Sequence, residues 1–402
     1  MKATVREAAE LAFRVVLGLG CVAGIWWSLK TVRADALYRA ATPESVREAI
    51  RLIADEPSYY LLLGQLDHRE ERSGLEHAVR LNAYDAPGRL ELAMELEGEG
   101  DTAGAERLLL EAYAVDRTYL QRWSLANFYL RRGDMAKFWY WAHMAAEMPS
   151  DDMHPLFQLC WRFQPDARFL ANIFLTDNPS SARQFLSFLL EKDQLAGMFD
   201  AASRLLQRGD PQTDAPLLLD AINRLAAAGD AVHSNDLWRR LIAQRWVTAD
   251  SQVPNNARFS RKPIPVVFDW NLPAPDGLNS RPGPSGLEVE FSGKQPEACT
   301  VAEQLVALAP GQYEFRSRYQ TSDIAPGTGL RWQLIDDTSK ALLAESPDLS
   351  SEGWRSDATT FPVADATHLV RLRLQYRRAS GTPRISGQLQ IVSTMIVIAR
   401  NR

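Results

Sequence analysis

The sequence predicts a multidomain protein with both α and β structure: an N-terminal transmembrane helix, a helical-repeat α-solenoid and a C-terminal antiparallel β-sandwich. Three observations predict this: a long apolar run near the N-terminus, a dipeptide that recurs at a repeat-like spacing, and short alternating runs after a composition change near residue 251. The expected domains are a short tail with the transmembrane helix, the helical repeats, a linker and the sandwich, at residues 1–35, 36–250, 251–263 and 264–402.

Composition excludes several classes of protein. The chain has 402 residues, of which 46% are hydrophobic and 24% charged, so it is expected to fold rather than to be disordered. Its net charge is −5, with −7 over residues 1–250 and +2 over residues 251–402. Neither part has the basic excess of a nucleic-acid-binding protein. Three cysteines and six histidines argue against a disulfide framework or a structural zinc site.

The apolar run at residues 11–29 is the candidate membrane anchor. It is interrupted only by Arg14, and a helix of this length reaches about 28 Å, close to the thickness of a bilayer core. Trp26, Trp27 and Lys30 near its end are typical of residues that anchor a helix at the membrane interface. We therefore expect the chain to contact a membrane through residues 11–29.

Other interpretations of this segment stay open. Ala34-Asp35-Ala36 has the small-x-small pattern of a signal-peptidase site, although the apolar run is longer than a usual signal. A lipid anchor at Cys21 and a buried core helix are further alternatives. Basic residues flank the run almost equally on both sides, so the positive-inside rule gives nearly a tie. The short N-terminal tail favours a single-pass protein of the cell inner membrane with most of the chain outside the cytoplasm.

The dipeptide Gly-Asp marks a repeat in the next region. It occurs at 100–101, 133–134 and 229–230, and the first two copies are 33 residues apart. Aligning these two copies places small residues at equivalent positions, among them Ala93 with Ala126 and Ala112 with Ala145. Repeats of this length are typical of stacked helix pairs, in which small residues allow close helix packing.

This pattern of small, aromatic and glycine positions resembles the tetratricopeptide repeat (TPR). Residues 180–210 and 215–244 read as two further degenerate helix pairs, whereas residues 150–182 fit the pattern poorly. The resemblance implies a curved solenoid whose concave surface binds peptides or partner proteins.

Aromatic and basic residues near the second repeat supply candidate partner-binding positions. Phe138, Trp141 and Ala142 share one helical face and are expected in the core. Trp139 and Tyr140 cannot both lie on that face, so at least one is available to a partner. We take Trp139, Tyr140, Arg131 and Arg132 as candidate partner-binding residues, with core packing and a solvated basic face as the alternatives.

Helical periodicity ends after residue 250. Short runs of alternating polar and apolar residues follow, separated by turn signals, at residues 287–293, 312–320, 329–336, 368–378 and 385–398. Such alternation predicts an antiparallel sandwich with one face of each sheet in the core and the other in solvent.

The order of several motifs resembles the jelly-roll sandwiches of carbohydrate-binding modules. These motifs are Phe-Asp-Trp at 268–270, FSGKQPE at 291–297, and Pro310-Gly311 followed by Tyr313 and Phe315. The resemblance implies glycan binding through exposed aromatic rings. Trp354, Trp332 and Tyr319 are the candidate glycan-binding residues, with burial in the sandwich core as the alternative for Trp332. Bacterial proteins that combine such an anchor, repeats and sandwich are associated with exopolysaccharide machinery.

The sequence offers no pattern that requires catalysis. It contains no GxSxG, HExxH, CxxC or phosphate-loop motif, and Asp151-Asp152 and Asp336-Asp337 read as turns rather than metal sites. We therefore predict a non-enzyme with no catalytic residue, metal or cofactor. The favoured function is a membrane-anchored scaffold for protein interactions in a bacterial envelope assembly. The alternative is glycan binding by the sandwich in polysaccharide assembly or export, and a hydrolase would need two converging carboxylates.

Overall fold

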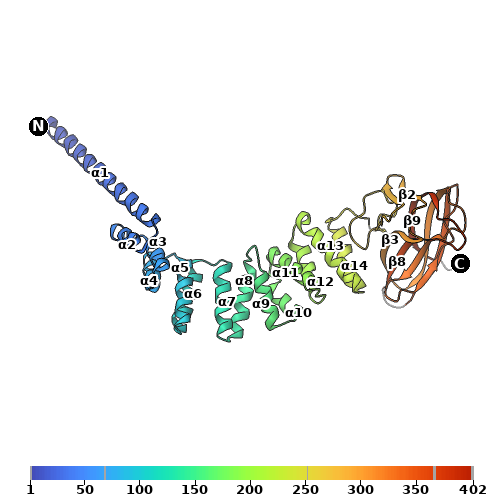
Figure 1. Cartoon of the computed structure of the whole chain (residues 1–402), viewed down its shortest axis with the longest axis horizontal. Helices are drawn as coiled ribbons and strands as arrows, with labels where there is room; N and C mark the ends of the chain where they lie inside the picture. Colours follow the sequence, from blue (N-terminus) through green and yellow to red (C-terminus); the bar gives the residue numbers. More distant parts are fainter. Residues whose placement is uncertain (1, 68, 251, 365–367, 400–402) are drawn as a thin grey trace. The chain divides into compact units, whose positions relative to one another are not determined.

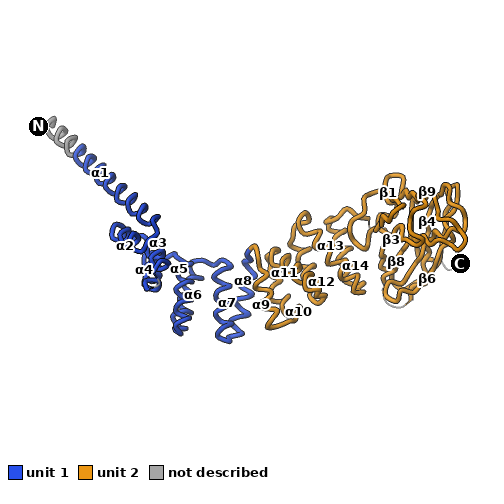
Figure 2. The backbone as a smooth tube through the Cα atoms, in the orientation of Figure 1, with its two compact units in different colours: residues 1–150 blue, residues 151–402 orange. Residues whose placement is uncertain are grey.

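The computed structural model describes residues 2–67, 69–250, 252–364 and 368–399, with side chains from Phe13 onward except that of His368. In this part of the chain, fourteen α-helices are followed by nine β-strands (Figure 1). The predicted fold class is confirmed, since helices precede two antiparallel sheets and the first helix is long and apolar. The described chain divides into two compact units, residues 1–150 and 151–402 (Figure 2).

The domain limits expected from the sequence stay predictions. Residues 1, 251 and 400–402, which fall at the ends of three expected domains, lie outside the described residues.

The first unit is helical. Its elements are α1 Lys2–Arg39, α2 Pro43–Leu52, α3 Pro57–Leu66, α4 Glu71–Leu81, α5 Ala86–Gly98, α6 Thr102–Val115, α7 Tyr119–Arg131 and α8 Met135–Glu147. Helices α3 to α8 pair as consecutive hairpins, α3 with α4, α5 with α6 and α7 with α8. The buried Ala93, Ala112, Ala126 and Ala145 lie where the aligned repeats place small residues, so the helices approach closely there.

The Gly-Asp dipeptides form the corners of these hairpins. Gly100 and Gly133 have φ values of 90° and 72°, a left-handed conformation that ends the first helix at little steric cost. The following aspartate caps the second helix, since Asp101 accepts from the Gly104 N–H at 2.9 Å and Asp134 from the Lys137 N–H at 3.1 Å. The 33-residue spacing therefore reflects one helix-turn-helix corner in each repeat.

A polar contact joins the two complete repeats. The buried Tyr129 on α7 donates a 2.7 Å hydrogen bond to Glu106 on α6, and Lys137 on α8 lies 3.1 Å from the same carboxylate. Burial and the bond to Glu106 raise the pKa of the Tyr129 phenol, while bonds from Tyr129 and Lys137 lower the pKa of Glu106. The contact fixes one hairpin against the next.

Helix α1 combines an exposed apolar segment with a C-terminal end that packs on α2 and α3. Its segment Phe13–Arg39 is long and apolar enough to cross a membrane, and its membrane-like window is not buried within the protein. The Lys30 ammonium lies 5.2 and 5.3 Å from the ring centroids of Trp26 and Trp27. The end of the helix joins the hairpins, because Ala34 is fully buried in a cluster with Val46 and neighbouring side chains.

The second unit begins with six more helices. They are α9 His154–Phe163, α10 Ala167–Phe174, α11 Pro179–Glu191, α12 Met198–Arg208, α13 Pro211–Ala227 and α14 Ala231–Ala243. Two of them, α9 and α10, lie in the segment that fits the repeat poorly; they are short, with ten and eight residues. The corner between α13 and α14 repeats the pattern of the first unit, with Gly229 at φ 82° and Asp230 capping α14.

The segment between α14 and the first strand packs on the sandwich. Phe259 is buried in the sandwich core and stacks on Trp270 at 4.7 Å between ring centroids. The fully buried Asp269 carboxylate accepts from Arg261 at 2.6 Å and from the Ile264 N–H at 2.9 Å. Asn223 on α13 bonds to both Pro265 and Val267, which attaches the segment to the helices of this unit.

Two antiparallel sheets face each other in the sandwich. The five-stranded sheet has the order β1 Leu278–Gly283, β2 Gly286–Ser292, β9 Ser386–Ile398, β4 Gly311–Ser322 and β7 Arg355–Val363. The four-stranded sheet has the order β3 Ala298–Leu308, β8 His368–Arg377, β5 Leu330–Asp336 and β6 Leu342–Glu345. Alternate residues of each strand point between the sheets and form the core, which leaves the outer face of the five-stranded sheet to solvent.

Candidate functional site

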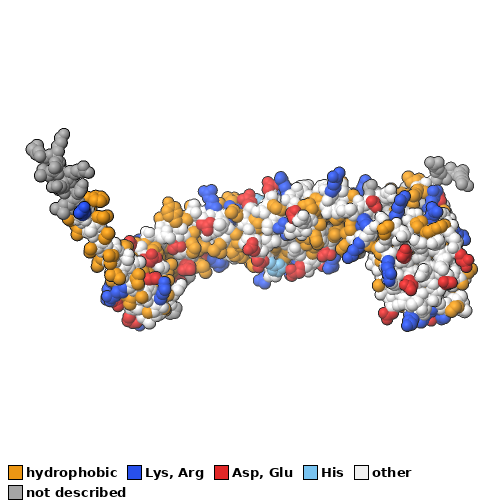
Figure 3. Space-filling model, turned by 90° about the horizontal axis from the view of Figure 1, so that it is seen from above, with side chains coloured by type: hydrophobic (Ala, Val, Ile, Leu, Met, Phe, Trp, Pro, Cys, Tyr) orange, Lys and Arg blue, Asp and Glu red, His pale blue; other side chains and the backbone are white. Residues whose placement is uncertain are grey.

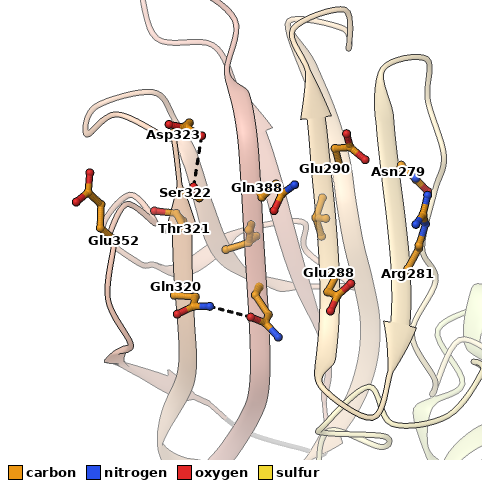
Figure 4. A pocket seen from close by; sticks show the side chains of 13 residues that line it. Asn279, Arg281, Glu288, Glu290, Gln320, Thr321, Ser322, Asp323, Glu352 and Gln388 are labelled. Atoms are coloured by element: carbon orange, nitrogen blue, oxygen red, sulfur yellow. Dashed lines mark hydrogen bonds between the residues drawn. The ribbon is translucent and has the colours of Figure 1, made fainter.

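A polar groove lies on the outer face of the five-stranded sheet. It has a volume of about 540 Å³ and is lined by side chains from β1, β2, β9 and β4 and from the loop before β7 (Figure 4). The lining includes Asn279, Arg281, Glu288, Glu290, Gln320, Ser322, Asp323, Glu352, Gln388 and Gln390. A row of amides, hydroxyls and carboxylates on a firm sheet is suited to bind a ligand with many hydroxyl groups.

Strand register brings these residues together. Glu288 and Glu290 occupy the outward positions of β2, where Glu288 pairs with Arg281 of β1 and with Gln390 of β9. On the other side of β9, Gln390 pairs with Gln320 of β4. The groove therefore crosses four neighbouring strands whose sequences lie up to about a hundred residues apart.

The centre of the groove is held by amides. The Gln320 side chain donates a 2.8 Å hydrogen bond to the Gln390 side-chain oxygen, and Gln390 donates to the Ser285 carbonyl at 3.2 Å. These bonds hold the two side chains in place before any ligand arrives, which lowers the entropy cost of binding.

The carboxylates of the groove are exposed. Glu288, Glu290, Asp323 and Glu352 all reach solvent, and in the described part of the chain neither Glu288 nor Glu290 makes a side-chain hydrogen bond or ion pair. The Arg281 guanidinium instead faces Asn279, whose amide oxygen, when turned toward it, accepts at 2.6 and 3.2 Å. The two glutamates on β2 are thus free to accept hydrogen bonds from a ligand.

Trp354 lies next to the sheet as an exposed aromatic ring. It is 46% exposed and immediately precedes β7, where Arg355 pairs with Tyr319 of β4. The Arg318 guanidinium, on the outward face of β4, lies 5.6 Å from the Trp354 ring centroid and supports it. Glu352, two residues before Trp354, and Gln320, two residues after Arg318, line the groove, whereas Trp354 itself is not part of the lining. Of the three aromatic residues predicted to bind glycan, Trp354 alone is exposed.

The other two aromatic predictions are wrong, because both rings are in the core. Trp332 is 0% exposed and packs against Trp270 and Phe315, with ring centroids 5.8 and 5.1 Å away. Tyr319 is also 0% exposed, and its hydroxyl donates to Asp357 at 2.9 Å. Burial and this carboxylate raise the Tyr319 pKa to about 12. Neither ring can stack on a sugar.

The arginines of the four-stranded sheet are paired. Arg371 and Arg373 on β8 both bond to Glu303 of β3, and Arg371 also bonds to Asp337. Asp336 caps its own turn by accepting from the Thr338 and Ser339 N–H groups. Within the described residues, no group of three His, Cys, Asp or Glu side chains could hold a metal ion. These side chains are already used in structural contacts.

Of the predicted partner-binding residues, Arg131 lies in a groove between helices. Arg131 lines a groove of about 230 Å³ on α5 and α7, whereas Trp139, Tyr140 and Arg132 do not. The structure places Trp139 half-buried against Phe138 and leaves Tyr140 exposed on α8. Arg131 itself makes a two-pronged ion pair with Glu97, at 2.8 and 2.6 Å. The apolar part of the groove is formed by Leu90, Met94, Leu120 and Trp123.

Basic and acidic side chains are mixed over the rest of the surface. On the face shown in Figure 3, Lys and Arg lie among Asp and Glu, and hydrophobic side chains gather along the described part of α1. No extended basic patch is visible on that face, in keeping with the overall negative charge.

The sequence matches no protein-family model and no curated protein. Three solved structures illustrate what the fold is similar to. One is described as CBM4 structure and function, with 12% identity and a TM-score of 0.27, covering 36% of this chain and 99% of that chain. A beta-1,3-glucan binding CBM6 from Bacillus halodurans has 14% identity and a TM-score of 0.22, covering 32% of this chain and 90% of that chain.

The third structure covers a larger share of this chain. It is described as the functional characterization of Pseudomonas aeruginosa PilF, with 14% identity and a TM-score of 0.23, covering 54% of this chain and 91% of that chain. At such identities and TM-scores, these likenesses carry no information about ligand or partner.

Proposed function

We propose that this protein is a membrane-anchored, non-catalytic protein that binds a polysaccharide chain in the groove of its five-stranded sheet. The groove itself is the observation that carries the proposal: about 540 Å³ lined by amides, hydroxyls and carboxylates, with Trp354 exposed beside it. Sugar hydroxyls both donate and accept hydrogen bonds, and the apolar face of a pyranose ring can stack on an indole. We place this activity in a bacterial envelope assembly linked to exopolysaccharide production.

The membrane anchor is supported by the environment of α1. Lys30 over Trp26 and Trp27 gives the amphipathic cluster typical of a membrane interface. Cleavage at Ala34-Asp35-Ala36 would remove Ala34 from the cluster it shares with α2 and α3, so a retained helix fits the packing better than a cleaved signal. We propose that α1 holds the protein in the inner membrane with the sandwich outside the cytoplasm.

A binding role fits the groove better than hydrolysis. A glycosidase needs one carboxyl group in a desolvated environment that raises its pKa, opposite a second carboxyl group. Glu288 and Glu290 are exposed and lie side by side on one strand, and Asp323 and Glu352 are also exposed. This arrangement suits hydrogen bonding to sugar hydroxyls.

We expect Trp354→Ala to weaken polysaccharide binding about tenfold, because stacking on the indole is lost. Full-length protein in detergent would be applied to an array of neutral, cationic and acidic polysaccharides. Tyr140→Ala is the matched control, since it removes an exposed aromatic ring from α8. Equal binding by the two variants, or no retention of the unaltered protein on any polysaccharide, would count against the proposal.

A second function is favoured by the groove on α5 and α7, which we propose binds partner proteins. Met94 is 68% exposed and Leu120 is 51% exposed, and both line the same groove as the half-buried Trp123. Apolar side chains grouped at the surface in this way are typical of an interaction site. The neighbouring carboxylates of α5 favour a partner segment with apolar anchors and basic residues.

We expect Leu120→Asp to remove the partners that the unaltered protein captures from detergent-solubilised membranes, because a carboxylate would be buried in the apolar groove. Val232→Asp on α14 is the control, since Val232 is equally apolar and 64% exposed. If Leu120→Asp still captures the same proteins at the same level, the groove on α5 and α7 is not their binding surface.

A further inference from the structure

The charge of the sandwich groove points to the class of its ligand. Its lining contains four carboxylates, on Glu288, Glu290, Asp323 and Glu352, and one guanidinium, on Arg281, which leaves a net charge of −3. The amides of Gln320, Gln388 and Gln390 add no charge. The groove is therefore a hydrogen-bonding surface with a negative potential.

This charge is not neutralised from within. Arg281 is turned toward Asn279, and no ion pair in the described structure reaches Glu288 or Glu290. Of the arginines on β4 and β7, Arg316 bonds to Glu314 and Arg355 bonds to Asp357, whereas Arg318 lies against Trp354 and keeps its positive charge outside the lining of the groove. The negative potential is thus available to a ligand.

Three kinds of glycan would meet this groove differently. An acidic chain would bring like charges within a few ångströms of the carboxylates, which disfavours binding. A neutral chain has no positive charge to offset that of the carboxylates, and it would displace part of their hydration. A chain with protonated amines would replace that hydration with charge-assisted hydrogen bonds.

The opposite face of the sandwich does not provide an alternative site for an acidic chain. Arg371 and Arg373 share Glu303, and Arg331 pairs with Glu345 and Asp348. Burial works against ionisation of Glu345, but hydrogen bonds from Gln333 and Arg331 outweigh it and lower the pKa, so this carboxylate stays ionised and bound. These arginines are therefore already paired with carboxylates of the protein and are not free to bind an acidic chain.

We propose that the groove binds a cationic glycan, a chain of amino sugars with free amines, through Glu288 and Glu290. This inference rests on the proposed glycan-binding function. The two glutamates lie on the same face of β2, two residues apart, so their Cα atoms are separated by about 7 Å. Trp354 offers an indole face to which an ammonium group is also attracted.

The test compares ligands that differ only in charge. Pentamers of glucosamine and of galactosamine would each be measured in the free-amine and N-acetylated forms, with polygalacturonate as the acidic probe. Binding to full-length protein in detergent would be measured at about pH 6. We expect at least one free-amine pentamer to bind about tenfold more tightly than its N-acetylated form, and polygalacturonate not to bind.

The variant Glu288→Gln/Glu290→Gln keeps the shape of the groove and removes two of its four negative charges. We expect it to lose this tenfold preference while binding the N-acetylated pentamers as before. The control variant Glu91→Gln/Asp220→Asn removes two exposed carboxylates from the helices and should keep the preference. This control separates the groove from general attraction to a negatively charged protein.

The outcomes distinguish the two proposals. Equal or tighter binding of the N-acetylated pentamers, preferential binding of polygalacturonate, or a preference that survives Glu288→Gln/Glu290→Gln would each overturn the cationic-ligand proposal and leave glycan binding intact. If none of these pentamers and no polysaccharide of the array is retained, both proposals fail.

Discussion

Replacing Trp332 by alanine is expected to lower the free energy of unfolding of the sandwich by about 3–5 kcal/mol. The indole is fully buried between Trp270 and Phe315, so its removal leaves a cavity lined by rings that cannot close it. The indole N–H has no hydrogen-bond acceptor among the described residues, so the loss comes from packing.

This loss of stability would be measured by unfolding the full chain in detergent with increasing urea, using proteolysis of the sandwich to detect its unfolding. Trp332→Phe should cost less, because most of the volume is kept. Trp354→Ala should change stability by less than about 0.5 kcal/mol, since this ring is at the surface. A Trp332→Ala protein that kept its stability and lost only glycan binding would contradict the core position of Trp332.

The second large effect is expected in the helices, where Asp214→Ala should cost about 3 kcal/mol. The Asp214 carboxylate on α13 is 0% exposed. It accepts two bonds from Arg183 on α11, one of them 3.1 Å long, and a third at 2.9 Å from the Asp210 N–H. Alanine would leave the Arg183 guanidinium and a helix N-terminus without their acceptor.

The matched control is Asp220→Asn, which changes an exposed carboxylate on the same helix and should cost less than about 0.5 kcal/mol. Urea unfolding followed by circular dichroism at the helical band would compare the two variants. Equal stability of Asp214→Ala and the unaltered protein would mean that the buried ion pair does not hold α11 against α13.

The helical region could be predicted because its signals are local. Each Gly-Asp dipeptide supplies a left-handed corner and a helix cap within two residues, and the alanines mark the faces where helices meet. The groove on α5 and α7 could not be predicted in this way, since it depends on Met94 of α5 lying beside Leu120 and Trp123 of α7. Neither methionine nor leucine at such positions differs in sequence from an ordinary core residue.

In the sandwich, the sequence predicts those strands that are hydrogen-bonded to another strand on each side. The five alternating runs correspond to β2, β4, β5, β8 and β9, which are the interior strands of the two sheets. The missed strands β1, β6 and β7 are edge strands, and β1 and β7 contain Pro282 and Pro362, which weaken a strand signal. The remaining edge strand, β3, ends just before the Pro310-Gly311 turn.

The groove was missed for a different reason. Its residues are the outward polar positions of strands, and such positions occur on every half-exposed sheet. Only the pairing of Glu288 with Gln390, and of Gln390 with Gln320, brings them together. The sequence predicts glycan binding by aromatic rings, but Trp332 and Tyr319 occupy inward positions of their strands. Trp354 precedes its strand and is exposed.

The most direct test of glycan binding in the groove is chemical labelling of carboxyl groups by a diazo reagent, which forms esters and does not couple the amines of the ligand, read by mass spectrometry. Full-length protein would be labelled with and without a saturating free-amine glucosamine or galactosamine pentamer. The groove site predicts reduced labelling of Glu288, Glu290 and Glu352, with no change at Glu91 on α5. A bound pentamer that left these three carboxylates fully labelled and protected others instead would contradict it.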